Sequence, residues 1–140
     1  MEEHPEAAYP KTAACACGAL TVSVTAPPWK VHVCTCLDCQ RISGSAFSYT
    51  AFFAEAATSI SGEFRTWRRV ASSGRWTESH FCPGCGSSMF CRMEAFPGIV
   101  GVAVGCFADP GFDKPATTYW TTRRHLWFVT PPELEIVDTQ

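Results

Sequence analysis

The sequence predicts a mainly β protein with one domain, and three observations support this prediction. Helical periodicity is nearly absent from the chain. Short segments with strand character are separated instead by glycine and proline. With 140 residues, the chain is long enough for one domain with its own core and too short for two comfortable ones.

Each predicted strand has its own signal. Residues 20–25 alternate apolar and polar side chains with a period of two, which indicates a half-buried strand. Residues 47–54 are rich in aromatic side chains, and residues 64–70 and 75–81 also suit a pleated surface. Residues 99–104 form an apolar, β-branched run, which predicts the most buried strand of the fold.

The remaining segments are shorter or more polar. We expect a last edge strand at residues 119–122 and one short helical turn at residues 109–113. No internal repeat and no low-complexity tract interrupts the chain. Residues 1–12 begin with a polar, acidic run and are expected to form a flexible N-terminal arm, which leaves residues 13–137 as the single domain.

The charge balance of the chain argues against nucleic acid and anionic membranes as partners. The formal net charge is −2, and 11 Lys and Arg residues face 13 Asp and Glu residues. That balance lacks the basic patch that nucleic acid or an anionic membrane would require. No stretch is apolar enough to span a bilayer, and none resembles a signal peptide. We therefore expect a cytoplasmic protein, whose clustered cysteines bind metal rather than form disulfides.

Cysteine is the most informative residue type in this sequence. Seven of the nine cysteines fall into three tight clusters: Cys15-x-Cys17, Cys34-x-Cys36-x-x-Cys39 and Cys82-x-x-Cys85. Thiolate is a preferred ligand of zinc, and these spacings let one turn present two sulfurs to a single ion. Two pairs and one triplet supply four plus three ligands. They suggest one closed structural site and one open site that carries out chemistry, with two zinc ions per chain.

The two pairs are the expected structural site. The alternative is a redox dithiol at Cys82 and Cys85, which a following helix would favour. Residues 86–90 do not form a convincing helix, and the pair Cys15 and Cys17 offers the missing ligands. A shared ion would tie the N-terminal strand to the middle of the fold and would contribute folding free energy directly.

The triplet is the expected open site, because catalytic zinc commonly keeps three protein ligands. An alternative remains, in which a fourth ligand closes the site and leaves it inert; the candidates are Cys91, Cys106, His32 and His80. The two lone cysteines stand in apolar surroundings and are expected to be small core residues rather than ligands.

Two tryptophans stand beside paired arginines. Trp67 precedes Arg68-Arg69, and Trp127 follows Arg123-Arg124. These segments could line a pocket with basic walls, and the equally weighted alternative is a solvated strand edge.

A wider set of residues carries a family resemblance. The order Cys15-x-Cys17-Gly18, Cys34-x-Cys36-x-x-Cys39-Gln40-Arg41, Ser43-Gly44-Ser45-Ala46-Phe47 and Phe81-Cys-Pro-Gly-Cys-Gly-Ser-Ser88 resembles the glutathione-dependent formaldehyde-activating enzyme family, which also includes centromere protein V. The resemblance continues through Gly105-Cys-Phe-Ala-Asp-Pro110 to Trp120 and Trp127, and it spans about residues 13–137.

The resemblance implies a fold, two metal sites and an activity. The fold would be a β-tent of stacked antiparallel sheets stapled by zinc. Cys15, Cys17, Cys82 and Cys85 would hold the structural zinc, and Cys34, Cys36 and Cys39 a looser zinc near the glutathione site. The implied activity is a carbon–sulfur lyase reaction, the formation of S-(hydroxymethyl)glutathione from glutathione and formaldehyde.

The chain departs from the family pattern at two places. Many relatives have a histidine where Thr35 stands, and many carry another where this chain has Thr117-Thr118. If either histidine assists proton transfer in the family, this chain lacks that assistance.

The mechanism expected from the triplet is thiolate transfer. A thiol substrate at the fourth position of the zinc would lose its proton at neutral pH and attack an aldehyde. Arg41 is the nearest basic residue in the sequence, and it could pair with a glutathione carboxylate or lie on the surface. Asp38 is expected to bond to backbone amides of the metal loop or to relay a proton.

Two other functions are weighed against this one. The first is a non-catalytic, zinc-stabilised binding module, in which the second site is closed. The second is association with nucleic acid, which the centromeric relative suggests and the net charge argues against. We expect small-molecule partners, a thiol such as glutathione and an aldehyde, with neither nucleic acid nor membrane.

Overall fold

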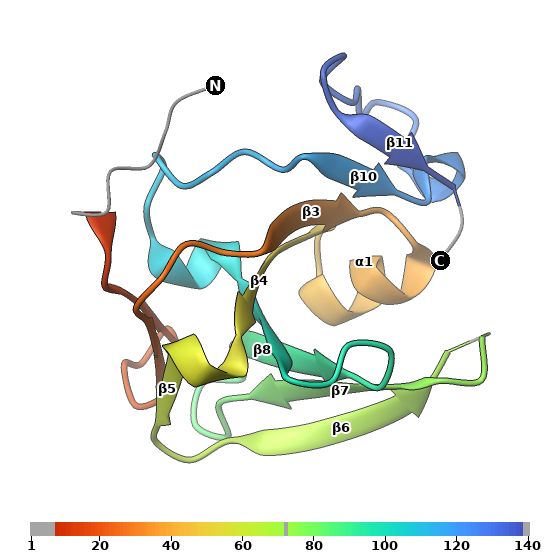
Figure 1. Ribbon diagram of the computed structural model, residues 1–140. Coiled ribbons are helices and arrows are strands. Elements are labelled where there is room, and N and C mark those ends of the chain that lie inside the picture. The colour runs from red at the N-terminus through yellow and green to blue at the C-terminus, as the bar shows by residue number, and fades with distance from the viewer. Residues whose placement is uncertain (1–7, 72, 139–140) are drawn as a thin grey trace.

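The computed structural model describes residues 8–71 and 73–138, and in these ranges the chain is mainly β (Figure 1). A small antiparallel sheet has the strand order β1-β2-β5. It consists of β1 (Lys11–Ala14), β2 (Thr21–Val24) and β5 (Thr58–Ser61).

The second sheet has eight strands in the order β11-β10-β3-β4-β9-β8-β7-β6. Its strands are β3 (Lys30–Cys34), β4 (Ser48–Ala54), β6 (Arg65–Val70), β7 (Trp76–Phe81), β8 (Ser88–Met93), β9 (Ile99–Ala103), β10 (Thr117–Tyr119) and β11 (Glu135–Val137). The helical elements are α1 (Leu37–Ser43) and the short 3-10 helices η2 (Glu55–Ala57), η3 (Val104–Phe107) and η4 (Thr121–Arg123).

The expectation of purely antiparallel sheets is wrong at one edge of the large sheet. Strand β10 runs parallel to both β3 and β11. Parallel neighbours need a long connection between them, and the chain supplies one on each side of β10. Residues 35–116 separate β3 from β10, and residues 120–134 separate β10 from β11.

Five of the predicted strands are confirmed as β2, β4, β6, β7 and β9. The predicted edge strand lies earlier than expected, at β10, which includes Tyr119 but ends there, and η4 begins at Thr121. Residues 109–113 form a tight turn rather than a helix, in which the Phe112 amide donates to the Asp109 carbonyl at 3.0 Å. The strands that the sequence pattern did not indicate are β1, β3, β5, β8 and β11.

Helix α1 was not predicted, and its sequence explains why. None of its residues is buried, so it has no apolar stripe with helical period. It begins at a cap formed by Cys36, whose thiol accepts a hydrogen bond from the Cys39 amide. It ends at Gly44, which has the left-handed conformation (φ 65°) that glycine adopts without strain.

The predicted N-terminal arm, residues 1–12, includes residues that belong to the folded domain. Residues 1–7 lie outside the described residues, whereas Lys11 and Thr12 belong to β1. Tyr9 packs against the core as well. The ordered part of the chain therefore begins before residue 13.

The core lies between the small sheet and one face of the large sheet. Its most buried side chains come from both sheets and include Ala13, Leu20, Val22, Val24, Ala51, Phe53, Met89, Val100 and Val102. Side chains alternate between the faces of a strand, so the residues between these ones point to the other face of the large sheet. On β4, Ala51 and Phe53 belong to the core, whereas Thr50 and Phe52 line a groove on the opposite face.

The large sheet is bent, and the groove follows its concave side. In Figure 1, β3 and β10 lie above α1 and β6, β7 and β8 lie below it, with β4 beside α1. Residues from the upper strands, the lower strands and α1 line one continuous groove of about 1420 Å³. Among the described residues, no helix is long and apolar enough to cross a membrane.

Candidate metal centres

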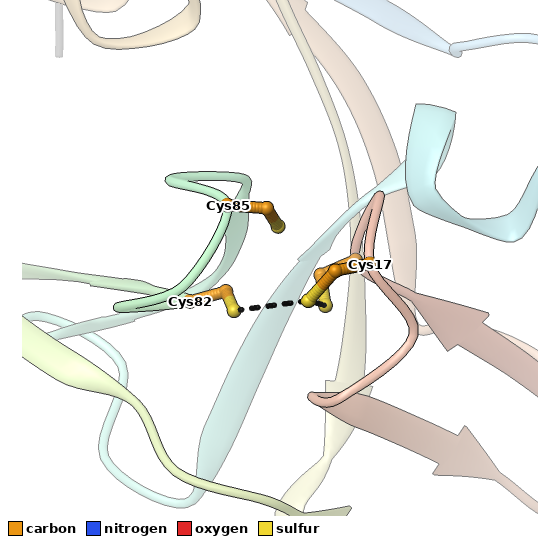
Figure 2. A group of neighbouring side chains, drawn as sticks. Cys17, Cys82 and Cys85 are labelled. Carbon is orange, nitrogen blue, oxygen red and sulfur yellow. Dashed lines mark hydrogen bonds between the residues drawn. The ribbon is translucent and has the colours of Figure 1, made fainter.

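The two cysteine pairs meet in space although most of the chain separates them. Cys15 and Cys17 follow β1, and Cys82 and Cys85 follow β7. The four Sγ atoms all lie within 4.8 Å of one another. Figure 2 shows Cys17 facing Cys82 and Cys85, and the Cys17 and Cys82 sulfurs are 3.7 Å apart. We call this group the four-thiol cluster.

The sulfur distances in the four-thiol cluster match those of a tetrahedral zinc site and are longer than a disulfide bond. All nine cysteines are free. Sulfurs bonded at about 2.3 Å to one tetrahedral ion lie about 3.8 Å apart, and a disulfide would bring them to about 2.05 Å. The Cys15–Cys17 and Cys17–Cys82 sulfur distances are 3.6 and 3.7 Å.

Hydrogen bonds around the cluster favour the thiolate form of Cys15 and Cys85. The Leu20 amide donates to Cys15 Sγ at 3.2 Å. The Ser87 hydroxyl lies 3.2 Å from Cys85 Sγ and accepts from the Ala16 amide at 3.0 Å. Hydrogen bonding by Ser87 lowers the pKa of Cys85 to about 5. One serine therefore connects the two halves of the cluster.

The triplet forms a second cluster at the end of β3 and the start of α1. The Sγ atoms of Cys34, Cys36 and Cys39 lie within 4.8 Å of one another. Cys34 is the last residue of β3, and Cys36 caps α1. The Cys39 amide donates to Cys36 Sγ at 3.3 Å, so the start of the helix holds two of the sulfurs together. We call this group the three-thiol cluster.

The three thiols of this cluster do not lose their protons equally. Hydrogen bonds from Cys34 and Cys39 lower the pKa of Cys36 to about 2, and the charge of Arg69 acts in the same direction. The hydrogen bonds to its two neighbours raise the pKa of Cys34, which is 1% exposed. The cluster thus favours a thiolate at Cys36 even without an ion.

No fourth ligand joins the three-thiol cluster among the described Cys, His, Asp and Glu residues. Each candidate named from the sequence has other contacts. His32 lies between the rings of Phe52 and Tyr119, at centroid distances of 4.6 and 4.9 Å. His80 stacks on a phenylalanine ring and hydrogen-bonds a threonine hydroxyl.

The two lone cysteines are also occupied elsewhere. Cys106 donates to the Ser88 carbonyl at 3.5 Å and packs against the core, as expected. Cys91 lies over Gly101 and lines the groove, and burial raises its pKa to about 12. It is an inert neighbour of the three-thiol cluster rather than a member of it.

The three-thiol cluster opens into the groove, and the four-thiol cluster does not. Cys34, Cys36 and Cys39 are all part of the groove lining, whereas none of the other four clustered cysteines is. Four cationic side chains also line the groove, and a single carboxylate does; they are Lys30, Arg69, Arg75, Arg123 and Asp38. The groove therefore suits an anionic ligand beside reactive thiols.

Arg69 is the basic residue that the structure brings to the three-thiol cluster. It extends from β6 to Asp38, with a distance of 3.2 Å between Nη1 and Oδ2, and its side chain is 18% exposed. Arg68, the preceding residue, points to the other face of the strand and pairs with Glu78. Strand alternation applied to the Arg68-Arg69 pair would have separated these two roles.

Arg41 occupies a different position from Arg69. Its side chain is 77% exposed, lies 3.9 Å from Asp38, and lines a shallow depression outside the groove. Asp38 therefore pairs with two arginines instead of bonding to amides of the metal loop. Trp67 and Trp127 are 53% and 69% exposed and stand outside the groove lining.

The position of Thr35 shows what this residue does. It is fully buried, and its hydroxyl donates to the carbonyls of Tyr119 at 3.0 Å and Trp120 at 2.6 Å. Its side chain therefore faces the end of β10 and is not part of the groove lining. Thr117 and Thr118 are buried in β10 beside His32 and Val33 of β3.

Comparison with known proteins identifies the family to which the chain belongs. The sequence pattern of the family described as glutathione-dependent formaldehyde-activating enzyme matches residues 10–123. The chain belongs to this family. Both thiol clusters and most of the groove lie within the matched residues.

A solved structure adds support for the fold alone. The crystal structure of a Rhodobacter sphaeroides protein, a structural genomics target, is similar with a TM-score of 0.56 and 18% sequence identity. The similarity covers 73% of this chain and 90% of that chain. Comparison with curated protein sequences finds no match.

Proposed function

We propose that this protein is a zinc-dependent carbon–sulfur lyase of the S-(hydroxymethyl)glutathione synthase type. It would join glutathione and an aldehyde, or cleave their adduct. The observation that carries this proposal is that three thiols without a fourth described ligand open into a cationic groove. Membership of the glutathione-dependent formaldehyde-activating family supports the substrate pair.

The two clusters would hold the two ions. The donor sets fit zinc, because each brings only thiols to within 4.8 Å. Cys15, Cys17, Cys82 and Cys85 would hold a structural ion, and Cys34, Cys36 and Cys39 the second ion. Zinc bound at the three-thiol cluster would lower the pKa of a substrate thiol nearby.

The cationic side chains of the groove would bind the substrate. Glutathione carries two carboxylates, and guanidinium groups bind carboxylates with strong charge-assisted hydrogen bonds. Arg69 stands beside Cys36 and is already held in place by Asp38. We assign it the nearer carboxylate and Arg123 the farther one, with Arg41 as an outer contact.

Tyr119 would complete the reaction. It is the register partner of Cys34, and Lys30 donates a hydrogen bond to its hydroxyl oxygen. The Tyr119 O–H is then free to donate to the aldehyde oxygen. As the substrate thiolate forms its bond to the carbonyl carbon, that oxygen takes up charge and accepts the Tyr119 proton, and the proton that the thiol released to solvent restores Tyr119. The reverse reaction runs the same transfers backwards.

The test is exchange-sensitive NMR of glutathione with ¹³C-formaldehyde, with and without zinc-loaded protein. We expect faster adduct exchange with the protein, loss of the acceleration in Cys36→Ala, and a slower reaction in Tyr119→Phe. An acceleration that persists in Cys36→Ala would contradict the assigned site. No acceleration by the wild type would favour the zinc-stabilised binding module.

A further inference from the structure

One side chain of α1 connects the three-thiol cluster to η4. Gln40 is half-buried, and the nitrogen of its side-chain amide donates to two backbone carbonyls, those of Thr35 and Arg123, both at 2.9 Å. Its Oε1 lies 3.0 Å from Nε2 of His125. Both N–H groups of this amide are therefore used within the protein.

These bonds fix the orientation of the Gln40 amide. Only the nitrogen can donate to two carbonyl oxygens, because exchange of the amide nitrogen and oxygen would place oxygen against oxygen at both contacts. The Gln40 oxygen then accepts, and Nε2 of His125 carries the proton. Gln40 thus has one arrangement that satisfies all three partners.

The two carbonyls belong to segments on which the candidate site depends. Thr35 stands between two cysteines of the three-thiol cluster. Arg123 is the last residue of η4 and lines the groove. The one carboxylate in the groove lining, Asp38, pairs with two other arginines, so the lining holds no acidic partner for Arg123. Gln40 therefore joins the loop that presents the sulfurs to a cation of the same groove.

The turn that carries Arg123 depends on contacts with this loop. Trp120 has a left-handed backbone (φ 57°), which residues other than glycine rarely adopt. Its carbonyl oxygen lies 2.6 Å from the Thr35 hydroxyl and accepts from the Arg123 amide at 2.9 Å. A backbone in this region persists only where its surroundings hold it. The bonds from Thr35 and Gln40 therefore maintain the turn in which Arg123 lines the groove.

Gln40 itself does not face the groove. It lines a separate shallow depression and is not part of the groove lining. A ligand in the groove would contact Arg123 and the thiols but not Gln40. Any effect of this side chain on a ligand must therefore act through the two segments that it holds.

We infer that Gln40 is a positioning residue that couples the three-thiol cluster to Arg123. It holds the two segments in one arrangement, so that a single ligand is bound through its sulfur at the cluster and through a carboxylate at Arg123. Two contacts to one ligand reinforce each other only while the spacing between them is kept. The inference rests on the proposed function for the assignment of a carboxylate to Arg123.

The first test measures the binding of two thiols to the zinc-loaded protein by calorimetry, without an aldehyde. Glutathione offers a thiol and carboxylates, and 2-mercaptoethanol offers a thiol without a carboxylate. We expect Gln40→Ala to weaken glutathione binding about threefold to tenfold and to change 2-mercaptoethanol binding by less than about twofold, with the zinc content unchanged. Equal weakening of both thiols, which a merely structural role predicts, would overturn the inference.

Two further variants serve as controls for this measurement. Gln40→Glu keeps the size of the side chain but loses both donors, so it should weaken glutathione binding at least as much as Gln40→Ala. Thr122→Ala alters an exposed residue of η4 that lies outside the groove lining and has no contact with Gln40. It should leave the binding of both thiols unchanged. Wild-type affinity in Gln40→Glu would overturn the role of the amide donors.

A double-mutant cycle tests the coupling itself. Arg123→Gln alone should weaken glutathione binding. Addition of Gln40→Ala to Arg123→Gln should weaken it no further than the more affected single variant, because both changes remove the same contact. Additive effects of the two substitutions would overturn the inference.

Turnover separates this inference from the proposed function. We expect Gln40→Ala to raise the KM for glutathione about threefold to tenfold while kcat changes by less than about twofold. Wild-type turnover together with additive effects on binding would overturn the inference and leave the lyase proposal intact. Non-additive effects on binding without any wild-type turnover would support the inference and overturn the lyase reaction.

Discussion

The two cysteine clusters use the same ligand chemistry in different surroundings. The four-thiol cluster joins the strand that begins the small sheet to the end of β7 in the large sheet. The three-thiol cluster uses residues 34–39 alone, and all three of its sulfurs face the groove. One cluster closes a long loop of chain, and the other closes almost none.

This difference predicts how much each ion would contribute to the free energy of folding. An ion that connects residues about seventy positions apart stabilises the folded state directly, because those ligands are dispersed in the unfolded chain. An ion held by one short turn adds little to the fold. It can be exposed to substrate without endangering the rest of the domain.

The largest effect is expected from Cys85→Ala. Cys85 is exposed, so its removal takes away a ligand without opening a core cavity. Structural zinc contributes about 10–16 kcal/mol in small zinc domains, which is as large as the whole stability of a typical domain, about 5–15 kcal/mol. We expect cooperative thermal unfolding to be lost in circular dichroism. Cys106→Ala, a cysteine outside both clusters, serves as the control and should unfold cooperatively.

Cys36→Ala should remove one metal ion and the activity while leaving the fold largely intact. We expect the metal content to fall from about two ions to one, with loss of activity. The fold should lose only the cap of α1, worth about 1 kcal/mol, which lowers the midpoint of unfolding by about 4 °C. Metal analysis and circular dichroism on one sample measure both. Unfolding as severe as in Cys85→Ala would contradict the division between the clusters.

Gly101→Ala tests the groove floor without touching either cluster. A Cβ atom there would lie 2.7 Å from Cys91 Sγ and 2.9 Å from Phe52 Cε1. Overpacking of this kind costs about 1–3 kcal/mol, and we expect denaturant unfolding to show it with both metal ions retained. Gly105→Ala is the matched control, because its Cβ meets nothing within 4 Å. Equal stability of the two variants would show that the groove floor is loosely packed.

Arg69→Gln and Arg41→Gln compare the two arginines that approach Asp38. Arg69 is mostly buried beside the three-thiol cluster, and Arg41 is largely exposed. We expect Arg69→Gln to raise the KM for glutathione about threefold to tenfold through loss of a charged hydrogen bond, with the metal content unchanged. Arg41→Gln should change it by less than about twofold. The reverse order would move the carboxylate contact to Arg41.

The smallest effect is expected from Tyr9→Phe, on the side of the small sheet. Burial raises the pKa of Tyr9 to about 12. The unfolded chain ionises this group near pH 10, so its contribution to stability is present below pH 10 and is lost as the pH rises through about 12. Denaturant unfolding from pH 9 to 12 should show a shallower decline in the Phe variant. Identical pH profiles would show that Tyr9 ionises freely.

The cysteine spacing predicted more of the site than the strand pattern predicted of the fold. Local spacing determines which sulfurs one turn can present, so the three-thiol cluster could be assembled from residues 34–39. The meeting of Cys15 with Cys82 depended on counting ligands. The parallel strand β10 could not be predicted, because three residues carry no sign of the direction in which they pair.

Three features of the site had weak local signals. Helix α1 lacks an apolar stripe because the groove lies on one side of it and solvent on the other. Arg69 reaches the site from β6, which is distant in sequence, and the only local signal for it would have been the alternation of Arg68 and Arg69. The buried role of Thr35 depends on the backbone of Tyr119 and Trp120, which no local pattern places beside it.

The most direct test of the difference between the clusters is the visible absorption spectrum of the protein with cobalt in place of zinc, titrated with glutathione. We predict that the thiolate–cobalt bands change on titration in the wild type and remain constant in Cys36→Ala, where only the four-thiol cluster keeps its ion. A wild-type spectrum that saturating glutathione leaves unchanged would show that both clusters are closed, and it would contradict the assignment of an open, working site to Cys34, Cys36 and Cys39.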